Sequence, residues 1–234
     1  MADILLVHGS CHGAWCWRDL IPALTTRGHR PRTLDLPGHG DGLPPQSATL
    51  EASCRAVAGA LTPETVVLGH SWAGFPITGA VAHALPRGLI YLCAYVPTSG
   101  MSLIEMRKAG PRQTIGDAAV KSADGHSYTI RPEAAPDLFY HDCAPEAVAL
   151  ALDHLCPQPV LPQATPLAVP PAWTALPKAY IRCAQDRTIP PEYQASMVAD
   201  WPRANVHVME TSHSPFLAAP EDLADLVDHI IARM

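Results

Sequence analysis

A serine in a tight turn of small residues is the feature of this 234-residue chain that most suggests chemistry. The apolar run at residues 66–68 leads into Gly-His-Ser-Trp-Ala-Gly, with Ser71 near the centre of the turn. A nucleophilic serine on a strand-to-helix turn needs small residues two positions before and after it. Gly69 and Ala73 occupy these positions, so the usual Gly-x-Ser-x-Gly is met as Gly-x-Ser-x-Ala. The pattern predicts a nucleophile elbow, and a buried or helix-capping serine is the alternative.

A serine hydroxyl becomes a good nucleophile when an imidazole takes its proton and a carboxylate orients that imidazole. The chain has twelve histidines, so position along the chain must identify the base. His213 follows the last strand-like run and Asp186 follows the one before it, which gives the chain order Ser, Asp, His. We therefore expect Ser71, Asp186 and His213 to form a catalytic triad. Asp186 could instead cap the next helix, and Asp200 and Glu210 are the rival acids.

The oxyanion that forms when a serine attacks an ester needs two backbone N–H donors. One comes from the residue after the nucleophile and the other from the loop after the first strand. Trp72 and Ser10 stand at these two places. Gly9 would let the loop approach the substrate closely, and His12 lies just beyond it. An ordinary strand-to-helix turn is the alternative for this loop.

Short apolar runs alternate with helix-periodic segments at both ends of the chain. We predict strands at residues 4–8, 32–36, 65–68, 89–96, 180–184 and 206–209, with amphipathic helices at 17–24, 50–61 and 220–230 and another after Ser71. This alternation is typical of βαβ units, whose strands collect functional residues at their carboxyl ends. The chain is therefore predicted to have an α/β fold, with an open, mostly parallel six-stranded sheet and helices on both faces.

The alternation stops for about 80 residues after Val96. The spacing of apolar residues over 148–155 predicts one short helix, and prolines should forbid regular structure in the second half of the stretch. A connection of this length is rarely idle. We therefore divide the chain into a core of residues 1–97 and 178–234 and an inserted cap, or lid, of residues 98–177. The alternative is an excursion that only packs on the core.

Composition narrows the classes of partner. The formal net charge is −6, the isoelectric point is near 6.0, and no Lys/Arg run exceeds two residues. We therefore expect this protein to bind small molecules, and neither nucleic acid nor a membrane. No apolar run could span a bilayer, and no basic-then-apolar leader precedes Asp3. Seven cysteines without a Cys-x-x-Cys pair favour free thiols in a reducing compartment. We expect a cytoplasmic protein, either a monomer or a homodimer.

Four stretches together resemble the α/β-hydrolase superfamily: Leu-Leu-Val-His-Gly-Ser-Cys-His-Gly-Ala-Trp-Cys-Trp, Leu-Asp-Leu-Pro-Gly-His-Gly, Gly-His-Ser-Trp-Ala-Gly and Gln-Asp-Arg-Thr-Ile-Pro. More narrowly, they resemble the plant methylesterase and hydroxynitrile lyase branch and its bacterial esterase relatives. The likeness runs through nearly the whole chain and is weakest at residues 98–140. It implies the α/β-hydrolase fold, the triad and oxyanion hole named above, and neither a cofactor nor a metal.

Two positions separate the activities of this branch. Its lyases resemble the esterases but carry a threonine after the first histidine of the oxyanion loop and a lysine after the catalytic histidine. This chain has Gly9 and Ser214 there, so it lacks the lysine ammonium that would pair with a departing cyanide. The resemblance therefore implies a serine carboxylesterase that works through an acyl-enzyme on Ser71. The alternatives are a hydroxynitrile lyase and a small-molecule receptor with vestigial hydrolase activity.

The expected pocket walls are mostly apolar, which suits a small to medium uncharged or aryl ester as substrate. Besides Trp72, the candidate substrate-binding residues are Gly9, His12, Leu138, Phe139, Tyr140 and Ser214. Those that are apolar fit an ordinary protein core equally well.

Overall fold

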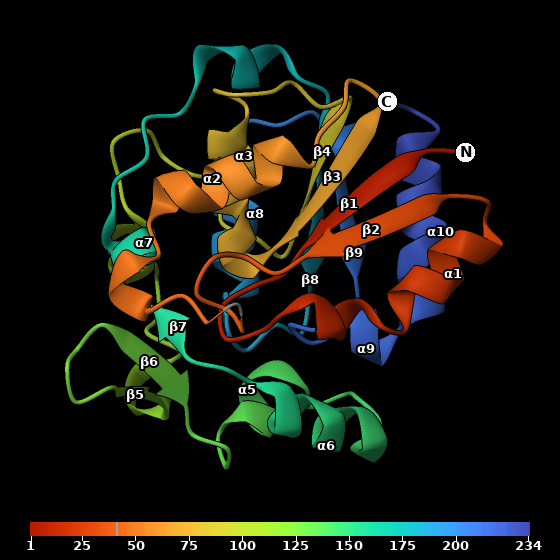
Figure 1. Ribbon diagram of the computed structural model, residues 1–234. Helices are drawn as coiled ribbons and strands as arrows, with labels where there is room; N and C mark the ends of the chain where they lie inside the picture. The colour runs from red at the N-terminus through yellow and green to blue at the C-terminus, as the bar shows by residue number, and fades with distance from the viewer. Residues whose placement is uncertain (41) are drawn as a thin grey trace.

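Six parallel strands form the central sheet of the computed structural model, which describes residues 1–40 and 42–234. The strand order is β2-β1-β3-β4-β8-β9 (Figure 1), and each neighbouring pair is parallel. The strands are β1 (Asp3–Val7), β2 (Arg30–Leu34), β3 (Thr65–His70), β4 (Gly88–Leu92), β8 (Lys178–Cys183) and β9 (Val206–Met209). The predicted six-stranded sheet is confirmed.

Four strands end earlier than the sequence predicts: β1 and β8 by one residue, β2 by two and β4 by four. Strand β4 ends at Leu92 because Cys93 adopts a φ of 34°, which a continuing strand cannot accommodate. Strand β2 ends at Leu34 because the next two residues turn toward the loop after β1. Asp35 Oδ1 accepts from the Ala14 amide at 2.6 Å, and the Leu36 amide donates to His8 Nε2 at 3.0 Å.

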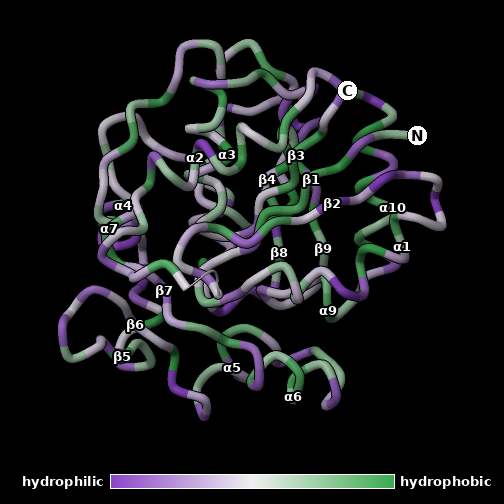
Figure 2. The backbone as a smooth tube through the Cα atoms, viewed as in Figure 1, coloured by the Kyte–Doolittle hydropathy of each residue, from purple (hydrophilic) through white to green (hydrophobic). Residues whose placement is uncertain are grey.

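Helices cover both faces of the sheet, as predicted (Figure 1). Helices α1 (Leu20–Thr26) and α10 (Pro220–Ile231) pack on one face, and α2 (Leu50–Gly59), α3 (Gly74–Ala80) and α8 (Pro191–Met197) pack on the other. Successive strand residues alternate between the two cores: Ile4 and Leu6 belong to one, and Leu5 and Val7 to the other. Figure 2 shows the central strands as largely hydrophobic, which is expected when both faces are buried.

The segment between β4 and β8 contains a three-stranded antiparallel sheet and several short helices: α4 (Leu103–Ala109), η4 (Gly116–Ala118), β5 (Ala119–Lys121), β6 (Ser127–Ile130), α5 (Ala135–Phe139), α6 (Pro145–His154), β7 (Gln158–Pro159), α7 (Leu161–Ala164) and η5 (Pro171–Ala175). Its middle part, from β5 to α6, lies below the main sheet in Figure 1, whereas α7 packs against α2. Helix α6 confirms the predicted short helix.

The prediction that prolines forbid regular structure in the second half of this segment was wrong. Helices α7 and η5 form there, each with a proline in its first turn. A proline at that position loses no hydrogen bond, because the first N–H groups of a helix have no partner within it.

The remaining elements are η1 (Ala14–Trp17), η2 (Pro45–Ser47), η3 (Ser71–Ala73), η6 (Arg203–Asn205) and α9 (Pro215–Ala218). All seven cysteines are free, as predicted, and five of them are buried. Within the described part of the chain, no helix is both long enough and apolar enough to cross a membrane.

The junction between α3 and the end of β4 gives a stability prediction. A Cβ atom at Gly74 would collide with the carbonyl oxygen of Tyr95. Alanine favours a helix over glycine by about 1 kcal/mol, but overpacking costs about 1–3 kcal/mol or more. We expect Gly74→Ala to lower the free energy of unfolding in urea by about 1–3 kcal/mol. The control is Gly59→Ala, whose Cβ would meet no atom within 4 Å and should not destabilise the protein. Equal stability of both variants would contradict this account.

Candidate active site

Ser71 directly follows β3 and has the backbone geometry of a strained turn. Its φ is 57°, a left-handed value that is uncommon for a residue with a side chain. The turn is tight on both sides: a Cβ at Gly69 would lie 2.7 Å from Ile77 Cδ1, and Gly74 lies against the Tyr95 backbone. The Tyr95 amide also donates to the Ser71 carbonyl at 3.1 Å. These contacts hold Ser71 at the sheet edge, as a nucleophile elbow would.

His213 lies between β9 and α9, close to the acid that the sequence assigns to it. Its Nδ1 lies 2.7 Å from Asp186 Oδ2, and both residues are buried, with exposed fractions of 2% and 3%. His213 and Ser71 line the same cavity. The rival acids Asp200 and Glu210 are exposed. The structure thus brings the three predicted residues together at the carboxyl edge of the sheet.

The buried carboxylate of Asp186 has a hydrogen-bond donor on every side. Its Oδ1 accepts from the amides of Thr188 at 2.7 Å and Ile189 at 2.9 Å. Its Oδ2 accepts from Gln194 Nε2 at 2.9 Å as well as from His213. Gln194 is itself fixed, because its Oε1 accepts from the Cys183 amide at 2.9 Å. Sequence analysis missed Gln194, which lies in α8 rather than at a strand end.

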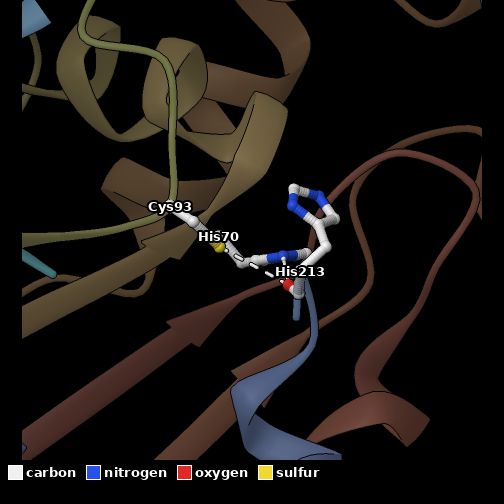
Figure 3. A group of neighbouring side chains, drawn as sticks. All are labelled: His70, Cys93 and His213. Atoms are coloured by element: carbon white, nitrogen blue, oxygen red, sulfur yellow. Dashed lines mark hydrogen bonds between the residues drawn. The ribbon is translucent and has the colours of Figure 1, made fainter. Parts of the chain in front are cut away.

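The backbone of His213 is held by two further side chains (Figure 3). His70 Nε2 donates to the His213 carbonyl oxygen at 2.8 Å, and Cys93 Sγ donates to the same oxygen at 3.4 Å. Burial holds the pKa of His70 well below its usual value, so the ring carries a single proton for this bond. The ligand atoms of these three residues lie within 4.8 Å of one another, close enough to hold a metal ion. His70 and Cys93 instead donate to a carbonyl, so the cluster holds the backbone of His213 in place.

The two predicted oxyanion-hole residues, Ser10 and Trp72, both line the cavity. Within the described part of the chain, neither backbone amide takes part in a turn or loop hydrogen bond. Both N–H groups are therefore available to a substrate oxygen.

Two glutamines that the sequence analysis missed hold the loop of Ser10 in place. Gln163 Nε2 donates to Ser10 Oγ at 2.7 Å, and the Cys11 amide donates to Gln158 Oε1 at 3.3 Å. Both glutamines are fully buried and come from the segment between β4 and β8. The oxyanion loop is therefore shaped partly by this segment.

Gly9, a candidate substrate-binding residue, does not line the cavity; it packs against the elbow. A Cβ at this position would lie 2.6 Å from His70 Nδ1 and 3.0 Å from Ser71 Cβ. Here the absent side chain makes room for His70 and Ser71.

Of the six candidate substrate-binding residues, Phe139 alone lines the cavity among the described residues. His12 Nδ1 donates to the Ser10 carbonyl at 2.7 Å, and the Tyr140 hydroxyl donates to His12 Nε2 at 2.7 Å. These two side chains therefore brace the oxyanion loop. Leu138 belongs to the buried core, and Ser214 is fully buried just before α9.

The cavity holds about 410 Å³ of open space, including its mouth. The loops at the carboxyl ends of the strands form one wall, and the segment between β4 and β8 forms the other. The lining residues are Ser10, Cys11, Ser71, Trp72, Tyr95, Leu103, Arg107, Ile115, Tyr128, Ile130, Phe139, Thr188, Ile189 and His213. Most of those missed by the sequence analysis fall in or near residues 98–140, where the family resemblance is weakest.

Removing the amide that supports Asp186 should weaken catalysis more than substrate binding. Gln194→Met deletes the donor to Asp186 Oδ2 and the acceptor for the Cys183 amide. We expect kcat to fall by about 10- to 100-fold, with little change in KM, and the free energy of unfolding to fall by about 1–3 kcal/mol. Esterase kinetics and urea unfolding check this. The exposed Gln46→Met is the control, and a Gln194→Met enzyme with the kcat of the wild type would refute the assignment.

Buried neutral histidines should make the protein less stable in mild acid. Burial lowers the pKa of His12 to about 4, below its usual value near 6.5. As the pH falls from about 6.5 toward 4, the unfolded chain binds this proton before the folded protein does, so stability is lost at about 1.4 kcal/mol per pH unit. In urea unfolding across this range, the free energy of unfolding of His12→Asn should therefore depend less steeply on pH than that of the wild type. The difference in slope should be up to about 1.4 kcal/mol per pH unit. The exposed His126→Asn should keep the wild-type slope; an unchanged slope for His12→Asn would rule out this contribution.

Comparison with known proteins gives a consistent result. The model of the alpha/beta hydrolase family matches residues 4–226. A carbendazim hydrolyzing esterase of Nocardioides sp. is 36% identical over 171 residues, which is 64% of this chain and 71% of that protein. The pFDCC methylesterase MES16 of Arabidopsis thaliana is 27% identical over 94% of this chain and 90% of its own. The crystal structure of a pyrethroid hydrolase from Sphingobium faniae JZ-2 superposes with a TM-score of 0.86, at 27% identity over 99% of this chain and 97% of that one. With its sheet, elbow and family match in agreement, the chain belongs to the α/β hydrolase family.

Proposed function

We propose that this chain is a serine carboxylesterase that acts through an acyl-enzyme on Ser71. The observation that carries the proposal is the buried 2.7 Å contact between His213 Nδ1 and Asp186 Oδ2, in a cavity that His213 shares with the strained Ser71. The names of the relatives support the same class of reaction, since they include a bacterial esterase and a plant methylesterase.

The proposed reaction uses groups of the protein alone. His213 Nε2 takes the proton of Ser71 as the hydroxyl oxygen attacks the ester carbonyl, and Asp186 stabilises the imidazolium that forms. The amides of Ser10 and Trp72 donate to the developing oxyanion. His213 then protonates the departing alcohol, and water repeats the cycle on the acyl-enzyme.

The walls of the cavity support small to medium esters with an apolar or aryl part. Aromatic and aliphatic side chains make up much of the lining, including Tyr95, Leu103, Tyr128 and Phe139. We also propose that residues 98–177 act as a cap on a core of residues 1–97 and 178–234. The seven free thiols support a cytoplasmic setting for the enzyme.

Replacing the nucleophile tests the proposal. Ser71→Ala should lower kcat on a p-nitrophenyl ester by at least about 10³-fold, while Ser47→Ala, at an exposed serine that does not line the cavity, should keep the wild-type activity. Initial rates on esters of increasing acyl length measure both effects, and mandelonitrile tests cyanohydrin cleavage in parallel. Full activity in Ser71→Ala would refute the proposal. Serine-dependent cyanide release without ester hydrolysis would establish the lyase instead, and ligand binding without turnover would establish a receptor.

A further inference from the structure

Arg107 is the one Lys or Arg side chain among the described residues that line the active-site cavity. It is half-buried on α4, one turn after Leu103, which lines the same cavity. Residues four apart share a face of a helix, so this face of α4 is turned toward the substrate space. The described part of the lining contains no Asp or Glu.

The guanidinium of Arg107 has no ion pair or side-chain hydrogen bond within the described residues. Charged side chains nearby in the sequence are engaged elsewhere. Arg112 pairs with Glu192 at 2.7 Å, and Glu105 accepts from Ser102 Oγ at 2.7 Å. Lys108, in the same last turn of α4, is exposed and can complement the helix dipole from solvent. A half-buried arginine without a protein partner at a ligand cavity is free to bind an anionic group of a substrate.

The positive charge acts on three walls of the cavity. Burial raises the pKa of Tyr128 to about 12, and Arg107 opposes this shift. Tyr95 and Cys11 also have raised pKa values, again through burial first and with Arg107 acting in the opposite direction. These three residues come from β6, from the loop after β4 and from the loop after β1. The positive charge of Arg107 therefore acts across the space that a substrate would fill.

We propose that Arg107 binds a carboxylate carried by the substrate, so that preferred substrates are esters that keep a free carboxylate, such as monoesters of dicarboxylic acids. This rests on the proposed esterase function and replaces the expectation of an uncharged ester. A guanidinium fork donates two charge-assisted hydrogen bonds to a carboxylate, and apolar walls strengthen this attraction. Ser71 on the sheet side and Arg107 on the cap side would then hold the two ends of one substrate.

A matched pair of substrates tests the proposal. Methyl monoesters of straight-chain dicarboxylic acids of increasing length carry the carboxylate, and the same esters with a terminal carboxamide have nearly the same shape without charge. We expect the wild type to prefer the carboxylate by about 10- to 100-fold in kcat/KM at the best chain length. Arg107→Gln should bring this ratio close to one. Arg107→Lys keeps the charge without the fork and should give an intermediate ratio.

Arg112→Gln is the control, because its guanidinium is already paired with Glu192 and does not line the cavity; it should keep the wild-type ratio. A wild-type ratio at or below one across the series would overturn the proposal, and so would a preference that survives in Arg107→Gln. If Arg107→Gln does not fold, Arg107→Lys replaces it in the test: an intermediate ratio supports the proposal, and an unchanged wild-type ratio overturns it. If the folded wild type hydrolyses p-nitrophenyl esters but shows no preference for the carboxylate, only this inference is refuted. If it hydrolyses no ester, the proposed function is refuted as well.

Discussion

A carboxylate can be buried only if donors replace the water it loses, and the active site is organised around how Asp186 meets this requirement. Two amides, the Gln194 side chain and His213 Nδ1 supply the four hydrogen bonds. The same set fixes the imidazole and leaves its Nε2 for the cavity. The His213 carbonyl is held in turn by His70 and Cys93, each of which adjoins the end of a central strand. The backbone of His213 is therefore anchored at the ends of β3 and β4, while its ring is oriented by Asp186.

The second constraint is the shape of the oxyanion loop, which depends on parts far apart in the sequence. On the core side, Gly9 leaves room for His70 and Ser71, and Asp35 binds the amide of Ala14. From the segment between β4 and β8, Gln163 binds Ser10. A change in this segment can therefore alter the position of the amides that would stabilise the oxyanion in the proposed reaction.

The proximity of Ser71, Asp186 and His213 could be predicted from the sequence because each of them follows a strand, and the carboxyl ends of parallel strands converge. Small residues around Ser71 marked the turn for a similar local reason. Arg107 and Gln163 could not be predicted in the same way, because the direction of their side chains depends on how the short helices α4 and α7 pack, and these helices carry no strong periodicity. Gln194 escaped notice because its role depends on a contact between α8 and the loop after β8. Local sequence patterns identified the residues at the strand ends, whereas tertiary packing determines which side chains surround them.

The central claim is that Ser71 carries the acyl group during turnover. Mass spectrometry on enzyme that has been acid-quenched during hydrolysis of a p-nitrophenyl ester tests this directly. The account predicts that the mass of one acyl group is found on the peptide that contains Ser71, and that it disappears as the reaction runs to completion. An acyl group on another residue, such as Cys11 in the same cavity, or steady turnover in an enzyme whose Ser71 is replaced, would contradict it.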